Sequence, residues 1–153
     1  MGATEKDFED LLKSFNKHKV KYCVVGAYAL ALYAAPRYTK DMDILVEASP
    51  VNAKKIIAAL RDFGFSALPL KESDFSRPGK TIQLGYEPVR ADILTSIDGC
   101  TFEEVWRNRK KGIYGSVTAY FIGVKELIRN KRTSGRTQDK VDVQALTKRR
   151  RAR

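Results

Sequence analysis

The stretch YCVVGAYALALYAAPRYTKDMDILV, from Tyr22 to Val46, decides the fold. It reads as a short apolar strand, a glycine turn at Gly26, a small-residue helix over 27–35, and a second apolar strand that opens with an acidic pair. Successive side chains of a strand point to opposite faces, so Asp41 and Asp43 share one face, about 7 Å apart along the backbone. The stretch therefore predicts a pair of carboxylates on one side of a buried strand.

This acidic pair calls for a cation. Two carboxylates on one face repel each other and lose hydration unless a positive charge lies between them, and hard oxygen ligands of this kind suit Mg²⁺. If the turn at Gly26 brings the amino terminus of the next helix to the same place, its free N–H groups favour a phosphate. A divalent metal together with a phosphate indicates a nucleotide ligand.

A third acidic residue, Asp92, lies in the apolar run VRADIL of a later expected strand. A carboxylate in such a setting is rarely buried without a partner. If this strand lies beside that of Asp41 and Asp43, three carboxylates converge and can hold two Mg²⁺ ions roughly 4 Å apart. One ion would orient a triphosphate and the other would activate an attacking hydroxyl.

The order of these residues resembles the nucleotidyltransferase superfamily with the polymerase-β-like fold. The resemblance rests on an apolar strand followed by Gly26, on the pattern Arg37-x-Thr39-x-Asp41-x-Asp43, and on Asp92 in a later strand. A further stretch, KELIRNKRTSGRTQDKVD over 125–142, resembles the Lys, Gly-Arg and Asp pattern that follows the core in a small prokaryotic branch. That branch includes AbiEii-type toxins, minimal nucleotidyltransferases of toxin–antitoxin pairs and lincosamide nucleotidyltransferases.

The resemblance implies an α+β fold, with a mixed β-sheet flanked by helices. It also implies Mg²⁺-dependent transfer of a nucleoside monophosphate from a nucleoside triphosphate to an acceptor hydroxyl, with release of pyrophosphate. The acceptor can be RNA, a protein or a small molecule. The implied catalytic and metal-binding residues are Asp41, Asp43 and Asp92, the last also helping to deprotonate the acceptor.

The nucleotide contacts are expected from Gly26 and Ala27 and from Arg37, Thr39 and Lys40. For Arg37 and Lys40 the alternative is ordinary surface charge beside a proline turn. The later Lys131, Arg136 and Asp139 are expected to form an ion pair at a helix end, with substrate contact as the alternative.

One departure from the family pattern supports a different function. Active relatives usually carry Gly-Ser or Gly-Gly and then a small residue, whereas Gly26 is followed by Ala27 and Tyr28. The missing serine hydroxyl removes one phosphate contact. The alternative is therefore a catalytically inactive nucleotidyltransferase-like module that binds nucleic acid or a toxin–antitoxin partner protein.

Length and charge set further limits. A chain of 153 residues can bury one substantial core, so we expect a single domain over 1–147 and a basic, disordered tail over 148–153. The formal net charge is +11, of which the tail supplies five charges. The remaining excess favours a polyanionic partner such as RNA or a nucleotide.

Membrane and secretory functions are not expected. The sequence has no run of eighteen apolar residues, and its polar first residues do not resemble a secretory signal. Cys23 and Cys100 lack metal-ligand spacing and are expected to stay reduced. We expect a cytoplasmic protein.

Hydrophobic spacing and turn residues predict the other elements. Helices are expected over 4–17, 50–63, 101–106, 124–132 and 137–148. Strands are expected over 22–25, 43–46, 65–70, 81–86 and 89–95, with a further hairpin over 112–120. The aromatic residues Tyr28, Tyr33, Tyr38 and Trp106 are expected to pack in the core, and the alternative for the tyrosines is a base-binding surface.

Overall fold

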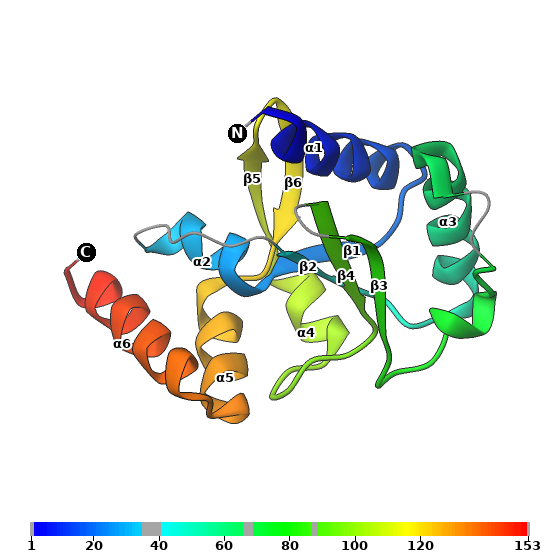
Figure 1. Cartoon of the computed structure of the whole chain (residues 1–153). Coiled ribbons are helices and arrows are strands. Elements are labelled where there is room, and N and C mark those ends of the chain that lie inside the picture. The colour runs from blue at the N-terminus through cyan, green and yellow to red at the C-terminus, as the bar shows by residue number, and fades with distance from the viewer. Residues whose placement is uncertain (1, 35–40, 66–68, 87–88, 153) are drawn as a thin grey trace.

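A six-stranded mixed β-sheet forms the centre of the molecule, and helices surround it (Figure 1). The computed structural model describes residues 2–34, 41–65, 69–86 and 89–152. The strands are β1 (Tyr22–Val25), β2 (Asp41–Val46), β3 (Thr81–Tyr86), β4 (Val89–Leu94), β5 (Lys110–Tyr114) and β6 (Val117–Phe121). The helices are α1 (Gly2–Lys17), α2 (Gly26–Tyr33), α3 (Pro50–Leu60), α4 (Phe102–Arg107), α5 (Val124–Ser134) and α6 (Thr137–Ala152), with short helical turns at Arg61–Phe65 and Glu72–Asp74.

The strand order is β3-β4-β2-β1-β6-β5. The two outer pairs, β3 with β4 and β5 with β6, are antiparallel hairpins. Between them β1 is antiparallel to β2, whereas β2 is parallel to β4 and β1 is parallel to β6. Parallel neighbours need a crossover connection, which α3 supplies between β2 and the outer hairpin. The expected α+β fold with a mixed sheet is confirmed.

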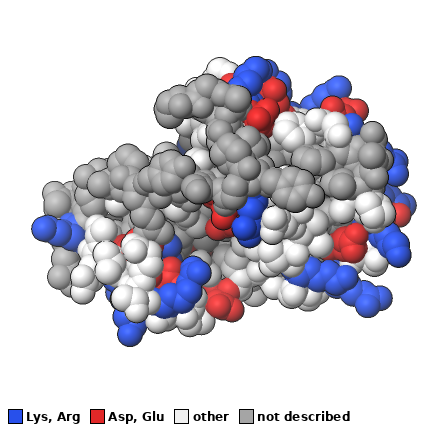
Figure 2. Space-filling view, viewed as in Figure 1, with Lys and Arg blue, Asp and Glu red and all other residues white. Residues whose placement is uncertain are grey.

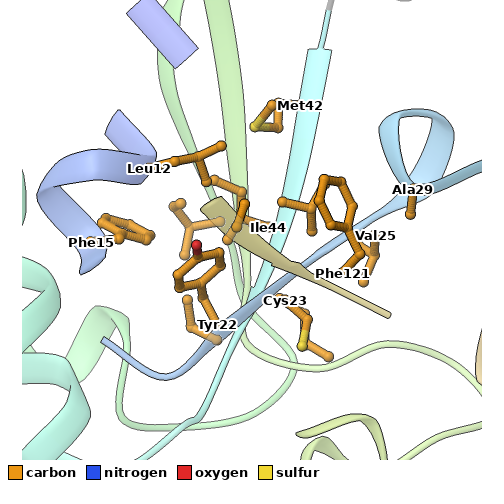
Figure 3. Close-up of a cluster of buried hydrophobic side chains, with 14 of the residues drawn as sticks. Leu12, Phe15, Tyr22, Cys23, Val25, Ala29, Met42, Ile44 and Phe121 are labelled. Atoms are coloured by element: carbon orange, nitrogen blue, oxygen red, sulfur yellow. The ribbon is translucent and has the colours of Figure 1, made fainter. Parts of the chain in front are cut away.

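Strand β1 lies in the middle of the core, and all four of its side chains are buried. Tyr22 packs its ring against Phe15 of α1 and against Tyr120 of β6, with ring centroids 5.7 and 5.8 Å apart. Figure 3 shows Tyr22 and Phe15 together with Leu12, Ile44 and Phe121 around this strand. The Tyr22 hydroxyl donates a hydrogen bond to Asn16 Oδ1 at 2.9 Å, which satisfies its polar end.

The buried side-chain amide of Asn52 in α3 links this helix to β1 and β2 by hydrogen bonds. Ser49 caps this helix by accepting a hydrogen bond from the Asn52 N–H, and Pro50 occupies the first turn, as the sequence predicts. The Asn52 side chain is 1% exposed. It accepts from the Lys21 N–H at 2.9 Å and donates to the carbonyls of Lys21 and Glu47 at 3.1 and 3.0 Å. The start of β1 and the residue after β2 are therefore held together by one side chain.

Three of the differences between the elements and the sequence expectations have a clear physical meaning. Strand β2 begins at Asp41, two residues early, because β4 extends its pairing to that position. The strand expected over 65–70 is not found among its described residues, since Phe65 ends a helical turn and Pro69 and Leu70 have no regular structure. An apolar run forms a strand only where a neighbouring strand can pair with it.

The third difference concerns the chain end. The sequence predicts the last helix over 137–148, whereas in the structure α6 continues to Ala152. Within the described ranges, no helix has the length and apolar character needed to cross a membrane.

Candidate active site

Strands β2 and β4 place four charged residues on one face of the sheet. In the parallel register Asp41 lies opposite Arg90 and Asp43 lies opposite Asp92. Residues two apart on a strand share a face, so all four side chains emerge on the same side. The two neighbours between them in β2 and β4, Met42 and Ala91, are buried at 0% and 4% exposure on the other side. The strand of Asp92 therefore lies beside that of Asp41 and Asp43, with the three aspartates on one face of the sheet.

Arg90, which was not predicted from the sequence as a site residue, supplies the positive charge within this group. Its Nε and Nη2 atoms donate hydrogen bonds to Oδ1 and Oδ2 of Asp92, each at 3.1 Å. Its Nη1 lies 3.8 Å from Oδ2 of Asp41. A two-pronged guanidinium–carboxylate pair of this kind is the strong form of the interaction. In this structure Arg90 therefore holds Asp92 and draws β2 and β4 together at the site.

Of the three aspartates, Asp43 has a raised pKa. Burial, together with the neighbouring charges of Asp92 and Asp41, raises its pKa from 3.8 to about 6. Arg136 and Arg90 act in the opposite direction and moderate this rise in the pKa. A carboxylate whose ionisation is resisted by two other carboxylates lies where a cation would be stabilised.

Gly26 brings the start of α2 against the carboxylate group. Val25, the last residue of β1, lies opposite Asp43, and Gly26 follows it with φ of +67°. A Cβ at Gly26 would lie 2.6 Å from Asp43 Oδ2, so only glycine fits. Val25 caps α2 without a side-chain hydrogen bond, and Ala27 supplies no hydroxyl. The first N–H groups of α2 thus begin next to Asp43.

The later basic motif reaches the same place from the junction of α5 and α6. Arg136 donates a hydrogen bond from Nε to Asp139 at 2.8 Å, and 78% of its side chain is exposed. The hydrogen bond to Asp139 and its charge are the main causes that raise the pKa of Arg136, and the charge of Asp43 adds to them, so Arg136 lies in the electrostatic field of that carboxylate. Arg136 is a second cation that sequence spacing alone does not assign to this site.

Behind Arg136 lies a buried ion network that joins α5 to α6. Lys131 Nζ contacts Asp139 at 3.3 Å and Asp142 at 2.9 Å, and the three side chains are at most 5% exposed. The hydroxyl of Ser134 also donates to Asp139. The helix-end ion pair expected for Lys131, Arg136 and Asp139 is present, and it has a second acidic member in Asp142.

The carboxylates of Asp41, Asp43 and Asp92 are suitable ligands for a divalent cation, but their side chains are not arranged as a complete metal site. Three carboxylates share one face, and the raised pKa of Asp43 reflects its burial beside the charges of Asp92 and Asp41. Across the described ranges, however, no group of three or more histidine, cysteine, aspartate or glutamate side chains is arranged to hold a metal ion. Arg90 occupies Asp92, so binding by all three carboxylates requires this guanidinium to shift.

Part of the expected nucleotide site lies outside the described residues. Arg37, Thr39 and Lys40, together with Tyr38, belong to the segment 35–40 between α2 and β2. The other two tyrosines pack as expected. The ring of Tyr28 lies against Phe8 and Tyr114, and the Tyr33 hydroxyl donates to the carbonyl of Ile122 at 2.7 Å.

Comparison with solved structures agrees with this fold. No protein-family model matches the chain, and no curated protein matches it. Among solved structures it is similar to the lincosamide antibiotic adenylyltransferase LnuA with lincomycin bound, at 20% identity and a TM-score of 0.56, covering 94% of this chain and 96% of that one. It is also similar to ANT(2")-Ia in complex with adenylyl-2"-tobramycin, at 9% identity and a TM-score of 0.58, covering 94% and 87%.

A third similar structure is an antigenic nucleotidyltransferase-like protein from Paracoccidioides brasiliensis. It shares 12% identity at a TM-score of 0.56 and covers 97% of this chain and 76% of that one. The sheet order, the paired aspartates and these likenesses define a protein with the nucleotidyltransferase fold.

Proposed function

We propose that this protein is a metal-dependent nucleotidyltransferase, which transfers a nucleoside monophosphate from a nucleoside triphosphate to an acceptor hydroxyl and releases pyrophosphate. The observation that carries the proposal is the register that sets Asp43 opposite both Asp92 and Val25, with Gly26 next in the chain. This register brings three carboxylates and the start of a helix to one point of the sheet. Such a point can receive both a divalent cation and a triphosphate.

In this proposal Asp41, Asp43 and Asp92 would hold Mg²⁺, which when bound neutralises the triphosphate and makes the acceptor hydroxyl easier to deprotonate. The N–H groups that follow Gly26 would receive a phosphate oxygen. Asp92 is the proposed base. Because Arg90 donates to both Asp92 oxygens, it has to release at least one of them before Asp92 can accept the acceptor proton.

Arg136 and the segment 35–40 complete the proposed triphosphate site. Arg136 is largely exposed and lies in the field of Asp43, so its guanidinium can approach a phosphate without leaving Asp139. Arg37, Thr39 and Lys40 remain proposed contacts of the triphosphate. Two of the similar structures are named for adenylyl transfer, which makes ATP the first donor to test.

The acceptor is proposed from charge. The similar proteins are named with small antibiotic substrates, lincomycin and tobramycin. The net charge of +11 instead favours RNA. Lysine and arginine side chains lie at several edges of one face of the molecule (Figure 2), so the positive charge extends well beyond the C-terminal helix.

The test is transfer of radiolabel from each α-labelled nucleoside triphosphate, with Mg²⁺, to total RNA, to the protein itself, to a lincosamide or to an aminoglycoside. We expect label on one acceptor with the wild type and none with Asp43→Asn. The matched control is Asp98→Asn, which makes the same change at an exposed loop residue and should keep full transfer. Absence of label from every acceptor with every nucleotide would overturn the proposal.

The second candidate is a catalytically inactive module that binds RNA or a toxin–antitoxin partner protein. Two observations favour it: Arg90 already occupies Asp92, and Ala27 lacks the usual hydroxyl. RNA binding by wild type that persists in EDTA, without any label transfer, would favour this candidate over the enzyme.

A further inference from the structure

A hollow lies at the end of β1 that is opposite to the carboxylates. Its volume is about 520 Å³. It is lined from the end of α1 and the turn before β1, from α3, from α4 and from the β5–β6 hairpin. The lining residues are Asn16, Lys19, Val20, Lys21, Lys55, Trp106, Lys111, Thr118 and Tyr120. We call this hollow the lysine pocket. The register explains the separation, since Val25 lies at the Asp43 end of β1 whereas Lys21 precedes its other end.

The lysine pocket is strongly positive. Four of its lining side chains are the lysines at positions 19, 21, 55 and 111, and none of its described lining residues is acidic. Lys21 shares its charge with Glu47, whose carboxylate lies 3.6 Å from its Nζ. The other three ammonium groups have no ion pair to an acidic side chain within 4.0 Å among the described residues. Three ammonium charges around one hollow repel each other, and an anion between them would relieve that repulsion.

Trp106 and Tyr120 form the aromatic wall of the pocket, and other side chains already contact their rings. The guanidinium of Arg109 lies 3.7 Å from the ring centre of Trp106 and 4.9 Å from that of Tyr120. Its Nη1 donates to the Trp106 carbonyl at 2.7 Å, which fixes this position. Phe102 stacks with Trp106 at 5.9 Å and 20°. Arg109 covers one face of the Trp106 indole, and Phe102 also stacks on this ring. We therefore expect the pocket to bind a ligand through the charges of its lysines and not by stacking of Trp106 on a base.

The size and the type of cation indicate the ligand. A volume of about 520 Å³ exceeds what one phosphate ion fills and lies in the range of sites for larger ligands. Lysine ammonium groups on flexible stems act as point charges and do not impose the fixed two-pronged geometry of arginine. Several such charges along a hollow neutralise successive phosphates of a backbone without reading its sequence.

We propose that the lysine pocket binds the phosphodiester backbone of single-stranded RNA, independently of base sequence. Lys55 and Lys111 approach the strand from α3 and from β5, while Lys19 and Lys21 approach it from the turn before β1. Arg109 adds positive charge behind the aromatic wall. The proposal concerns binding alone, so it stands or falls separately from nucleotidyl transfer at Asp41, Asp43 and Asp92.

The chain provides a matched control for this proposal. Lys54 precedes Lys55 in α3, and Lys110 precedes Lys111 in β5, yet neither is among the described residues that line the pocket. Neighbouring residues on a strand point to opposite faces, and on a helix they are about 100° apart. The double variants Lys55→Gln/Lys111→Gln and Lys54→Gln/Lys110→Gln therefore lose the same charge from the same elements, but only the first loses it from the pocket.

The experiment measures fluorescence anisotropy of a labelled 12-nucleotide single-stranded RNA with the full chain, in EDTA, between 50 and 200 mM salt. We expect the pocket variant to bind about tenfold more weakly than wild type at 100 mM salt. The plot of log K against log salt has a negative slope for wild type. The magnitude of this slope should be smaller by about 1.4 in the pocket variant, since each single-strand phosphate contact contributes about 0.7. The control variant should weaken binding less than threefold, and equal thermal midpoints should show that both variants are folded.

Three outcomes would overturn the proposal. The first is equal weakening by the two double variants, which would assign binding to overall charge. The second is no binding of the RNA by wild type at 50 mM salt. The third is complete displacement of the RNA by 1 mM AMP, which would assign the pocket to a mononucleotide.

Discussion

The Cα of Gly26 lies so close to Asp43 that a methyl group on it would stand 2.6 Å from the carboxylate oxygen Oδ2. Gly26→Ala is therefore expected to displace Asp43 and to reduce nucleotidyl transfer on the order of 100-fold. The variant should also lose about 1–2 kcal/mol of stability, because φ at this position is +67°. Single-turnover transfer assays and urea unfolding measure the two effects.

Gly79→Ala is the control for this prediction. Gly79 also has a positive φ, +83°, but a Cβ there would meet nothing within 4 Å. It should show a similar loss of stability with unchanged transfer. Equal loss of transfer in both variants would contradict a specific contact between Gly26 and Asp43.

The raised pKa of Asp43 predicts a pH-dependent stability. Burial and the charges of Asp92 and Asp41 raise this pKa from 3.8 to about 6. Between these pH values the folded protein keeps a proton that the unfolded chain has released, so this group lowers the free energy of unfolding as pH rises through the window. Asp43→Asn removes that loss. In EDTA, the variant should gain about 2 kcal/mol relative to wild type between pH 4 and pH 7. Urea unfolding at several pH values measures the difference, and a constant difference would contradict the prediction.

Arg90 is expected to compete with divalent cations for Asp92. Arg90→Ala should destabilise the metal-free protein by about 1.5–3 kcal/mol, because it removes two charged hydrogen bonds. The same variant should show a larger rise in thermal midpoint than wild type when Mg²⁺ is added. Differential scanning fluorimetry with and without EDTA measures both quantities. Arg77→Ala, at an exposed loop position, should match wild type. A smaller Mg²⁺ effect in Arg90→Ala than in wild type would mean that Arg90 helps to assemble the cation site.

Lys131 is expected to be essential for the attachment of α6. Lys131→Met leaves Asp139 and Asp142 buried without their shared cation, which should cost about 3–5 kcal/mol. Lys125→Met, at an exposed position of the same helix, should change stability by less than about 0.5 kcal/mol. Urea unfolding followed by circular dichroism compares the two variants, and similar midpoints would contradict the role assigned to Lys131.

Local pattern was sufficient to predict much of the fold. The apolar run before Gly26 and the period-two spacing of Asp41 and Asp43 depend on neighbouring residues, and both elements are present. The cap at Ser49 is equally local and is confirmed. Val51 shows where local reasoning stops, because this apolar residue in the first turn of α3 is 66% exposed.

Arg90 could not be assigned from the sequence for a different reason. It lies two residues before Asp92 and so shares its face, which is a signal that period-two reasoning could have used. Its partner Asp41, however, depends on which strands are neighbours and in what register, and that is set by long-range packing. The lysine pocket was missed for the same reason, since its residues come from α1, the turn before β1, α3, α4, β5 and β6.

Strand β1 is the shortest in the sheet, and this brevity has a consequence for any long ligand. Lys21 lines the lysine pocket, and Val25 lies opposite Asp43. Four steps along an extended backbone span about 13 Å, and hydrogen-bonded neighbours on both sides prevent that length from changing. Strand β1 thus sets a fixed distance between the lysine pocket and the aspartates. A polymer bound in the pocket can present to the aspartates only units that lie at least this far along its chain.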